Sequence, residues 1–370
     1  MSVNATTSLV LVSELKIENF RCYDFAEIPI NSGITLIYGK NGSGKSSIIE
    51  GIYFALSGKS FRTTDLNTLI RRQAELTQTF ITFDSSNGVK ITKKSNQKCK
   101  ILETKDKKTL TYAQLVSKYP TCLVENKEFF FTTSTPEEKR AYLNKTLFYV
   151  EQKSNIIFKE LKQAIYQRAA CLKNNDYKQI AFWDQKLIEL EPTITELNQK
   201  LVNALNDMLQ SGEIIEHFSD KNPWLTDLSI QYAPGYDNSV NFSDILQKNM
   251  EKDRILKRTT AGPHKRSFNI HLNSLSAQDL LSRGQQKIVS IILHLIQRDL
   301  IHLETGTNPI LLMDDISSEL DKDNANLMLK YLISKRVQTV MTSIEKKRFS
   351  GEKDVFMFHV EQKGDKSYVK

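Results

Sequence analysis

A short glycine-rich segment near the N-terminus carries the residue types that bind phosphate groups. Residues 39–46 read Gly-Lys-Asn-Gly-Ser-Gly-Lys-Ser, which satisfies the pattern G-x-x-x-x-G-K-[ST]. The apolar run 34–38 before the segment is typical of a buried strand, and residues 46–56 after it have the apolar spacing of a helix. In that setting the backbone N–H groups curl around an anion, and the helix N-terminus adds positive charge. The residues predicted to contact a nucleotide here are Gly39, Lys40, Asn41, Gly42, Ser43, Gly44, Lys45, Ser46 and Ser47.

Four side chains are predicted to act on the nucleotide and its metal ion. Lys45 is expected to reach the β- and γ-phosphates, and the Ser46 hydroxyl to ligate Mg²⁺. A second apolar strand, 310–313, ends in Asp314 and Asp315, and carboxylates at the tip of a buried strand indicate a bound cation. We therefore assign Asp314 to the metal together with Ser46. Asp315 is assigned to catalysis with Lys45, as the general base or water-positioning residue, and the expected cofactors are ATP and Mg²⁺.

A third segment indicates the class of ATPase. Residues 281–286 read Leu-Ser-Arg-Gly-Gln-Gln and resemble the ABC signature Leu-Ser-Gly-Gly-Gln. At a helix start, Ser282, Gly284 and Gln285 present a hydroxyl and N–H groups to an anion. In ABC-type ATPases this cap faces the nucleotide of another subunit, so ATP is predicted to join two copies of the chain. Residues 317–321 resemble the D-loop that follows the acidic strand in this class.

Composition and length set broad limits. The chain has 370 residues, of which 40% are hydrophobic and 25% charged, and this length suggests two domains. The sequence has no uninterrupted apolar run of about 20 residues and no secretory signal, so we expect a cytoplasmic protein that does not cross a membrane. The four cysteines lack C-x-x-C spacing and are predicted to be free thiols.

The charge is uneven along the chain. The formal net charge is +8, which by itself is weak evidence for nucleic-acid binding. Many lysines gather in residues 89–118, where they either neutralise a phosphate backbone or form a solvated hairpin face, and composition leaves both interpretations open. The lysines are Lys90, Lys93, Lys94, Lys98, Lys100, Lys105, Lys107, Lys108 and Lys118.

The remaining elements follow from hydrophobic periodicity. Residues 79–110 read as antiparallel strands, and residues 137–209 favour helix, with nearly heptad apolar spacing at the end. The helical stretch predicts two or three antiparallel helices and is too short for a long coiled-coil arm. We expect an α/β P-loop NTPase fold, an ABC-type ATPase head with an antiparallel β-subdomain and an inserted helical lobe. The predicted domains are an ATPase lobe of residues 1–119 plus 304–370 and a helical lobe of residues 120–303.

With these motifs in place, nearly the whole chain is similar to the RecF family of bacterial DNA-repair ATPases. The further segments that carry the resemblance are residues 19–21, 49–53, 58–63, 139–143, 166–168, 232–235 and 261–265. The resemblance implies nucleotide contact by Arg21, an ATP-dependent homodimer on DNA, and release by hydrolysis. It also implies binding to single-stranded, duplex or gapped DNA, and work with RecO and RecR to load RecA at gaps in repair and replication-fork maintenance. Slow ATP turnover is expected for a separate reason, because Ser343 is not the histidine of transporter ATPases.

Some positions depart from the family pattern, and other classes compete with it. Arg283 replaces a glycine of most ABC proteins, Asn144 replaces an aspartate, residues 265–267 replace an arginine followed by an acidic residue, and residues 126–128 lack the usual proline, which leaves the Q-loop residue unidentified. Ser343 stands where transporter ATPases place histidine. The alternatives are an SMC- or Rad50-like head, an anti-phage ABC-type ATPase, and a scaffold that binds ATP without hydrolysing it.

Overall fold

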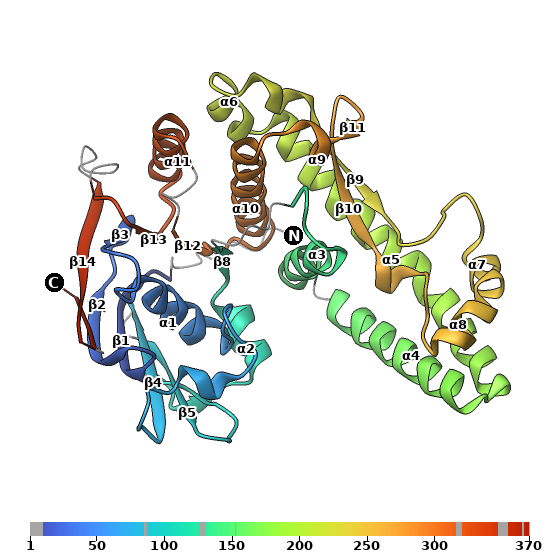
Figure 1. Ribbon diagram of the computed structural model, residues 1–370, viewed down its shortest axis with the longest axis horizontal. Coiled ribbons are helices and arrows are strands. Elements are labelled where there is room, and N and C mark those ends of the chain that lie inside the picture. Colours follow the sequence, from blue (N-terminus) through green and yellow to red (C-terminus); the bar gives the residue numbers. More distant parts are fainter. Residues whose placement is uncertain are drawn as a thin grey trace, which may run out of the picture. The chain divides into compact units, whose positions relative to one another are not determined.

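The computed structural model describes residues 10–84, 87–125, 131–151, 153–315, 320–346, 354–364 and 366–369. The chain divides into two compact units, residues 1–128 with 297–370 (unit 1) and residues 129–296 (unit 2). Both boundaries differ from those predicted from the sequence. The first lies later because the strand β8 (Thr121–Val124), predicted to belong to the helical lobe, pairs with β12 (Ile310–Met313) in a sheet of unit 1 (Figure 1).

A six-stranded sheet in the order β15-β14-β3-β13-β12-β8 carries the site of unit 1. Every neighbouring pair from β14 to β8 is parallel, and β15 adds an antiparallel edge strand. The inner strands are largely buried, and β3 and β12 are mostly apolar, as expected where both faces are covered. Because their carboxyl ends meet at one edge, the residues that directly follow β3 and β12 lie close to the end of β13. The other bounds are β3 (Ile34–Tyr38), β13 (Thr339–Ser343), β14 (Val355–Lys363), β15 (Lys366–Val369) and α11 (Lys322–Ser334).

A second, antiparallel sheet packs on the helix that follows β3. Its order is β2-β1-β4-β5-β6-β7, and residues such as Ile17 and Ile81 share one core with Ile48 and Ile52 of α1 (Lys45–Ser57). The predicted antiparallel β-subdomain is therefore present, although it also contains strands outside residues 79–110, the range predicted from the sequence. The bounds are β1 (Val12–Phe20), β2 (Tyr23–Pro29), β4 (Leu76–Phe83), β5 (Gly88–Lys94), β6 (Lys100–Glu103) and β7 (Lys108–Thr109), with η1 (Leu66–Leu69) and α2 (Tyr112–Lys118) in the connections.

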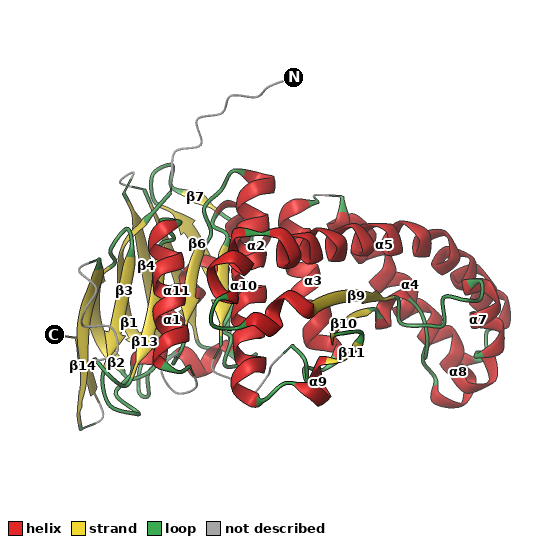
Figure 2. Ribbon diagram, turned by 90° about the horizontal axis from the view of Figure 1, so that it is seen from above, coloured by secondary structure: helices red, strands yellow, loops and turns green. Residues whose placement is uncertain are grey.

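Unit 2 contains the predicted helices. The first, α3 (Pro136–Val150), begins with a capping box between Thr135 and Glu138. The long helices α4 (Ser154–Asn174) and α5 (Tyr177–Ser211) pack through apolar side chains such as Leu161 and Leu190. A small sheet, β11-β10-β9, lies beside these helices (Figure 2). The Asn206 side chain of α5 accepts a hydrogen bond from Ile230 N of this sheet at 2.8 Å.

The rest of unit 2 consists of short elements that lead to the helix α10 (Arg283–Thr305), which begins in this unit and ends in unit 1. No helix in the described part of the chain is long and apolar enough to cross a membrane. The four cysteines are free, as predicted. The short elements are α6 (Glu213–Ser219), η2 (Pro223–Asp227), β9 (Leu228–Ala233), α7 (Phe242–Lys248), α8 (Met250–Leu256), η3 (Pro263–Lys265), β10 (Ser267–Leu272), β11 (Leu275–Ser276) and α9 (Ala277–Leu280).

A buried cation ties the helices of unit 2 together. Arg168 of α4 is fully buried and pairs with Asp184 of α5 at 2.5 Å and Asp253 of α8 at 2.6 Å. Its Nη1 also donates to the Thr259 hydroxyl at 3.0 Å. Burial raises the pKa of Asp184, against the effect of the Arg168 charge. The segment 166–168, one of those that resemble the family, thus contributes an internal brace for three helices.

The stability of the protein is expected to depend on pH through a buried histidine in unit 2. His294 of α10 lies against the rings of Phe131 and Tyr142, and burial lowers its pKa to about 3. The unfolded chain protonates this imidazole near its ordinary value of about 6.5, so the free energy of unfolding should fall as the pH drops below that value. Between pH 7 and pH 5 we expect a loss of about 1–2 kcal/mol in urea titrations. The His294→Leu protein should lose less over the same interval, and an equal loss in both proteins would contradict this assignment.

Candidate nucleotide site

The glycine-rich loop lies between β3 and α1, as the sequence predicts. Gly44 is the N-cap of α1 with φ 106°, a left-handed conformation that L side chains rarely adopt. A Cβ at Gly44 would lie 2.7 Å from Ser367 Oγ and 2.8 Å from Tyr23 Oη, and a Cβ at Gly39 would lie 2.3 Å from the Val360 carbonyl. The surrounding strands therefore approach the loop too closely for any side chain at these two positions.

Lys45 points back into the loop that precedes it. Its ammonium donates to the carbonyl oxygens of Gly39 at 2.8 Å and Lys40 at 2.9 Å, and the residue is only 7% exposed. Burial lowers the pKa of Lys45, and the carboxylates of Asp315 and Asp314 oppose that shift. A cation enclosed by a curled backbone at a helix N-terminus fits a polyphosphate.

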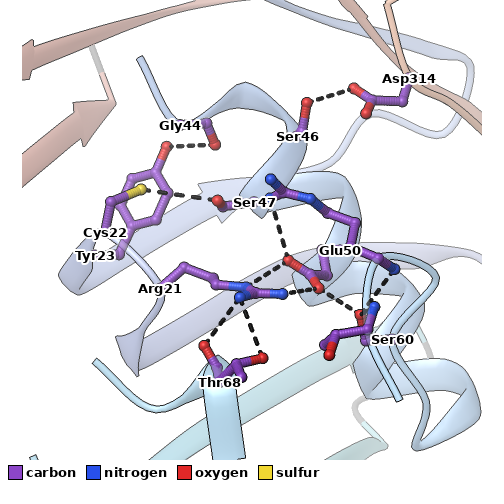
Figure 3. Close-up of polar contacts among 12 residues, drawn as sticks. Arg21, Cys22, Tyr23, Gly44, Ser46, Ser47, Glu50, Ser60, Thr68 and Asp314 are labelled. Atoms are coloured by element: carbon purple, nitrogen blue, oxygen red, sulfur yellow. Dashed lines mark hydrogen bonds and ion pairs between the residues drawn. The ribbon is translucent and has the colours of Figure 1, made fainter. Parts of the chain in front are cut away.

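The structure brings together the two residues assigned to the metal ion. The Ser46 hydroxyl donates to Asp314 Oδ1 at 2.9 Å (Figure 3). Hydroxyl and carboxylate oxygens are the ligands that Mg²⁺ prefers, usually in company with substrate phosphates. The described residues contain no cluster of three or more His, Cys, Asp or Glu side chains suited to a metal. The donor set therefore fits an ion that takes few protein ligands and completes its shell from the nucleotide and water.

One residue of this site was not assigned a role from the sequence. Thr342 at the end of β13 donates to Asp314 Oδ1 at 2.7 Å and accepts from the Asp315 N–H at 2.7 Å. Asp315 itself has φ 46°. The parallel pairing of Met313 with Met341 places Thr342 beside Asp314. Only that pairing, and no local pattern, identifies Thr342 as the residue that orients both aspartates.

Arg21, which the family resemblance implies is a nucleotide contact, is braced by a buried carboxylate. Its Nε and Nη2 donate to the two oxygens of Glu50 at 2.8 and 2.7 Å, and its Nη1 donates to the Thr68 carbonyl at 3.0 Å (Figure 3). Glu50 is fully buried in α1 and also accepts from the Ser60 hydroxyl at 2.5 Å. The segments 49–53 and 58–63, which carry the resemblance, meet at this carboxylate.

A cationic cleft of about 670 Å³ opens beside this cluster. It is lined by Arg21, Arg62, Arg71 and Arg72 together with Ser47 at the start of α1. Arg62 is also 3.5 Å from Glu50. The cleft adjoins the phosphate loop and suits a negatively charged or strongly polar part of a ligand, such as the remainder of a nucleotide.

The signature segment lies in unit 2 and begins α10. Ser282 N donates to Gln285 Oε1 at 2.9 Å, and Gln285 N donates to Ser282 Oγ at 3.4 Å, which is a reciprocal capping box. Ser282, Arg283 and Gly284 are exposed, and a Cβ at Gly284 would meet no atom within 4 Å. The predicted cap thus exists and is open to solvent.

Two predicted segments fall on positions that the structure does not describe. Residues 316–319, most of the expected D-loop, and residues 126–130, which include the Q-loop region, lie outside the described residues. Asp321, which follows the first of these gaps, caps α11 by accepting from Asn324 N at 2.8 Å.

The lysine cluster separates into structural and exposed members. Lys93 is buried and donates to Asn67 Oδ1 at 2.8 Å and to the Gln97 carbonyl at 2.7 Å, and Lys118 pairs with Glu103 at 2.5 Å. Both were predicted as candidate phosphate contacts, but their partners belong to the antiparallel subdomain itself. Lys90 is partly exposed, and the exposed members besides the paired Lys118 are Lys94, Lys98, Lys100, Lys105, Lys107 and Lys108.

Comparisons with known proteins agree with this geometry. The profile of the family described as "RecF/RecN/SMC N terminal domain" matches residues 11–367. A "DNA replication and repair protein RecF" from Shewanella sp. (strain MR-7) is 31% identical over 357 residues, covering 94% of this chain and 97% of that protein. The solved "Structure of the recombination mediator protein RecF-ATP in RecFOR pathway" superposes with a TM-score of 0.80 at 20% identity, covering 100% and 99% of the two chains. An Smc head bound to the C-terminal winged helix domain of ScpA superposes with a TM-score of 0.57 at 15% identity, covering 97% of each chain.

Replacing the enclosed lysine tests the phosphate loop. The Lys45→Met protein should bind a fluorescent ATP analogue about a hundredfold more weakly or worse, because charge-assisted hydrogen bonds to phosphate are removed. Lys59→Met, at an exposed lysine just beyond α1, is the matched control and should bind normally. Near-normal affinity in folded Lys45→Met protein would refute the assignment.

Proposed function

The chain belongs to the RecF/RecN/SMC N-terminal domain family and, within it, to the RecF family, and from this we propose that it is a DNA-binding ATPase of recombinational repair. The observation that carries the proposal is the meeting of Ser46 with Asp314 at the carboxyl end of the parallel sheet, next to the enclosed Lys45. This arrangement suits a nucleoside triphosphate and its metal ion.

ATP hydrolysis is the proposed reaction. Mg²⁺ held by Ser46 and Asp314 would offset negative charge on the phosphates, and Lys45 would contact the β- and γ-phosphates. Asp315 would accept a proton from the attacking water or orient that water, with its backbone held by Thr342. The partly exposed tip of a buried strand is a position from which this carboxylate can face the water, and a scaffold that only bound ATP would not need it.

The exposure of the signature cap supports a further part of the proposal, ATP-dependent dimerisation. Ser282 offers a hydroxyl and Gly284 a backbone N–H at the start of a long helix, a suitable partner for a γ-phosphate. Gln285 orders this cap, because its N–H donates to the Ser282 hydroxyl. We propose that this cap closes on the nucleotide of a second copy, so that two ATP molecules lie between two subunits. Hydrolysis would then remove the shared γ-phosphates and release the dimer.

The DNA partner is proposed from the exposed lysines of the antiparallel subdomain. Lys94, Lys98 and Lys100 lie at the β5–β6 turn before β6, and Lys105, Lys107 and Lys108 lie past the other end of β6, in the following turn and strand. Such a surface suits phosphate contacts and carries no base specificity. The solved RecF structure is described as a recombination mediator in the RecFOR pathway. By analogy, this protein would act in the cytoplasm with RecO and RecR at gapped DNA to promote RecA loading.

An SMC-like head is the second candidate. The shared family profile and the Smc head superposition support a common fold. The insertion here differs from a long coiled-coil arm, because α4 and α5 have 21 and 35 residues and α5 is followed, after the short elements α6 and η2, by a small sheet within the same unit. A RecF-type function agrees better with this short helical insertion and with 31% identity over most of the chain.

The assembly mechanism is tested with two variants. Asp315→Asn should bind ATP normally but hydrolyse it about 10²–10⁴-fold more slowly, because a general base is removed, and it should accumulate as a dimer in analytical ultracentrifugation with ATP. Ser282→Arg should bind ATP yet remain monomeric, because a bulky cation replaces the small hydroxyl of the cap. A Ser282→Arg dimer, or unchanged single-turnover hydrolysis by Asp315→Asn, would exclude the corresponding role.

The DNA surface is tested by salt dependence. If the exposed lysines contact duplex phosphates, reversing Lys100, Lys105 and Lys108 to Glu should flatten the plot of log affinity against log salt by about 0.9 for every phosphate that is no longer neutralised. Reversing three exposed lysines of unit 2, Lys162, Lys173 and Lys178, provides a control with the same change in net charge. An unaltered slope in the first triple variant would place the DNA elsewhere.

A further inference from the structure

A buried glutamine stands directly behind the signature cap. Gln286 is 7% exposed, although it lies in the first turn of α10, close to the exposed Ser282 and Arg283. Its side chain donates from Nε2 to the Leu281 carbonyl at 2.9 Å and, more weakly, to the Gln278 carbonyl at 3.4 Å. Its Oε1 accepts from the Thr132 hydroxyl at 2.9 Å, and that threonine is also 7% exposed.

These bonds hold the two peptide groups that flank Ser282. The Gln286 side chain binds the Leu281 carbonyl, and the Gln286 backbone N–H donates to the Ser282 carbonyl at 2.9 Å. With both neighbouring carbonyls anchored, the backbone torsions of Ser282 have little freedom. The direction of its hydroxyl and of the N–H groups that follow is set before any ligand arrives, and such preorganisation strengthens binding.

The orientation of the Gln286 amide is determined by its partners. If the amide were rotated by 180°, Oε1 would face the Leu281 carbonyl, and two acceptors would oppose each other without a proton between them. Nε2 must therefore point to Leu281 and Oε1 to Thr132. The threonine hydroxyl is in turn committed as a donor, so each of the three groups depends on the next.

Thr132 lies just before the Thr135 cap of α3, and both Thr132 and Gln286 belong to unit 2. The Thr132–Gln286 bond thus joins the segment before α3 to the first turn of α10 within one unit.

We propose that Gln286, held by Thr132, is a positioning residue that presets the Ser282 cap for the nucleotide of a second copy of this chain. The proposal rests on the ATP-dependent dimer described above. The effect of the Gln286 side chain passes through the Leu281 carbonyl, on the N-terminal side of Ser282. We call the hydrogen bonds from Thr132 to Gln286 and from Gln286 to the Leu281 carbonyl the relay. Loss of the relay should therefore weaken assembly while leaving each subunit's own ATP binding intact.

The experiment compares four substitutions in an Asp315→Asn background, where ATP dimers accumulate. Gln286→Leu removes the relay at similar side-chain size, and Thr132→Val removes only the hydroxyl. The dimer dissociation constant with saturating ATP should rise about tenfold in the first and about threefold to tenfold in the second, as expected for buried hydrogen bonds. Thr132→Ser, which keeps the hydroxyl, should restore parental assembly. Gln278→Ala is the matched control, because this exposed residue contributes only its carbonyl.

A second measurement does not depend on dimerisation. Amide hydrogen exchange in the nucleotide-free monomer should become faster at residues 281–286 in Gln286→Leu and Thr132→Val, and remain unchanged in Thr132→Ser and Gln278→Ala. Equal ATP affinity in all variants, measured with a fluorescent analogue, completes the expected result.

Three outcomes would overturn the positioning role: parental exchange rates and assembly in both disruptive variants, a loss of ATP affinity that accounts for the loss of dimer, or failure of Thr132→Ser to restore assembly. If Gln286→Leu does not fold, Thr132→Val decides between these results. A parent Asp315→Asn protein that never dimerises with ATP would instead refute the proposed assembly, and the exchange data would still test the relay.

Discussion

The Asp314 carboxylate holds together segments of unit 1 that are far apart in the sequence. Its Oδ1 accepts from Ser46 at the start of α1 and from Thr342 at the end of β13, while the Asp314 N–H donates to Val124 at the end of β8. Because parallel strands bring their carboxyl ends to one edge, a single acidic residue can reach all of these elements. The ligands for a metal ion bound here would already be held in position by the sheet, so little reorganisation would be required when nucleotide binds.

Buried charged side chains elsewhere in the protein also have partners of opposite charge. Glu50 lies in the P-loop helix and binds Arg21 and Ser60, while Arg168 forms ion pairs with acidic side chains of two other helices. An uncompensated buried charge would cost several kcal/mol, so these residues constrain which elements pack together. The Arg21–Glu50 pair has a further consequence, because it fixes an arginine on the wall of the cationic cleft and so preserves the cleft's charge and shape.

The departures from the family pattern in unit 2 also have a structural explanation. Arg266 is almost fully buried, and its guanidinium donates to Asn144, to Asn198 at 3.0 Å and to the Pro263 carbonyl at 3.0 Å. Burial lowers the pKa of Arg266 to about 10, and the Arg140 charge contributes to the shift. Asn144, which stands where the family has aspartate, thus serves as a neutral acceptor for a buried arginine that occupies a position usually acidic. The two substitutions that looked separate in the sequence are partners in the structure.

Features that depend on neighbouring residues could be predicted from the sequence: the P-loop between strand and helix, the acidic end of β12, the capping signature and the long helices of unit 2. Each is encoded within a short window by periodicity, capping or glycine spacing. The side chains that support these features became evident only in the folded chain. Three supporting side chains have partners far away in the sequence: Thr342 binds a residue 28 positions away, Glu50 one 29 positions away, and Gln286 one 154 positions away. The folded chain also shows that Lys93 donates hydrogen bonds inside its own subdomain. The reason is physical: burial and hydrogen-bond partnership depend on strand pairing and helix packing, which bring together residues that no local pattern relates.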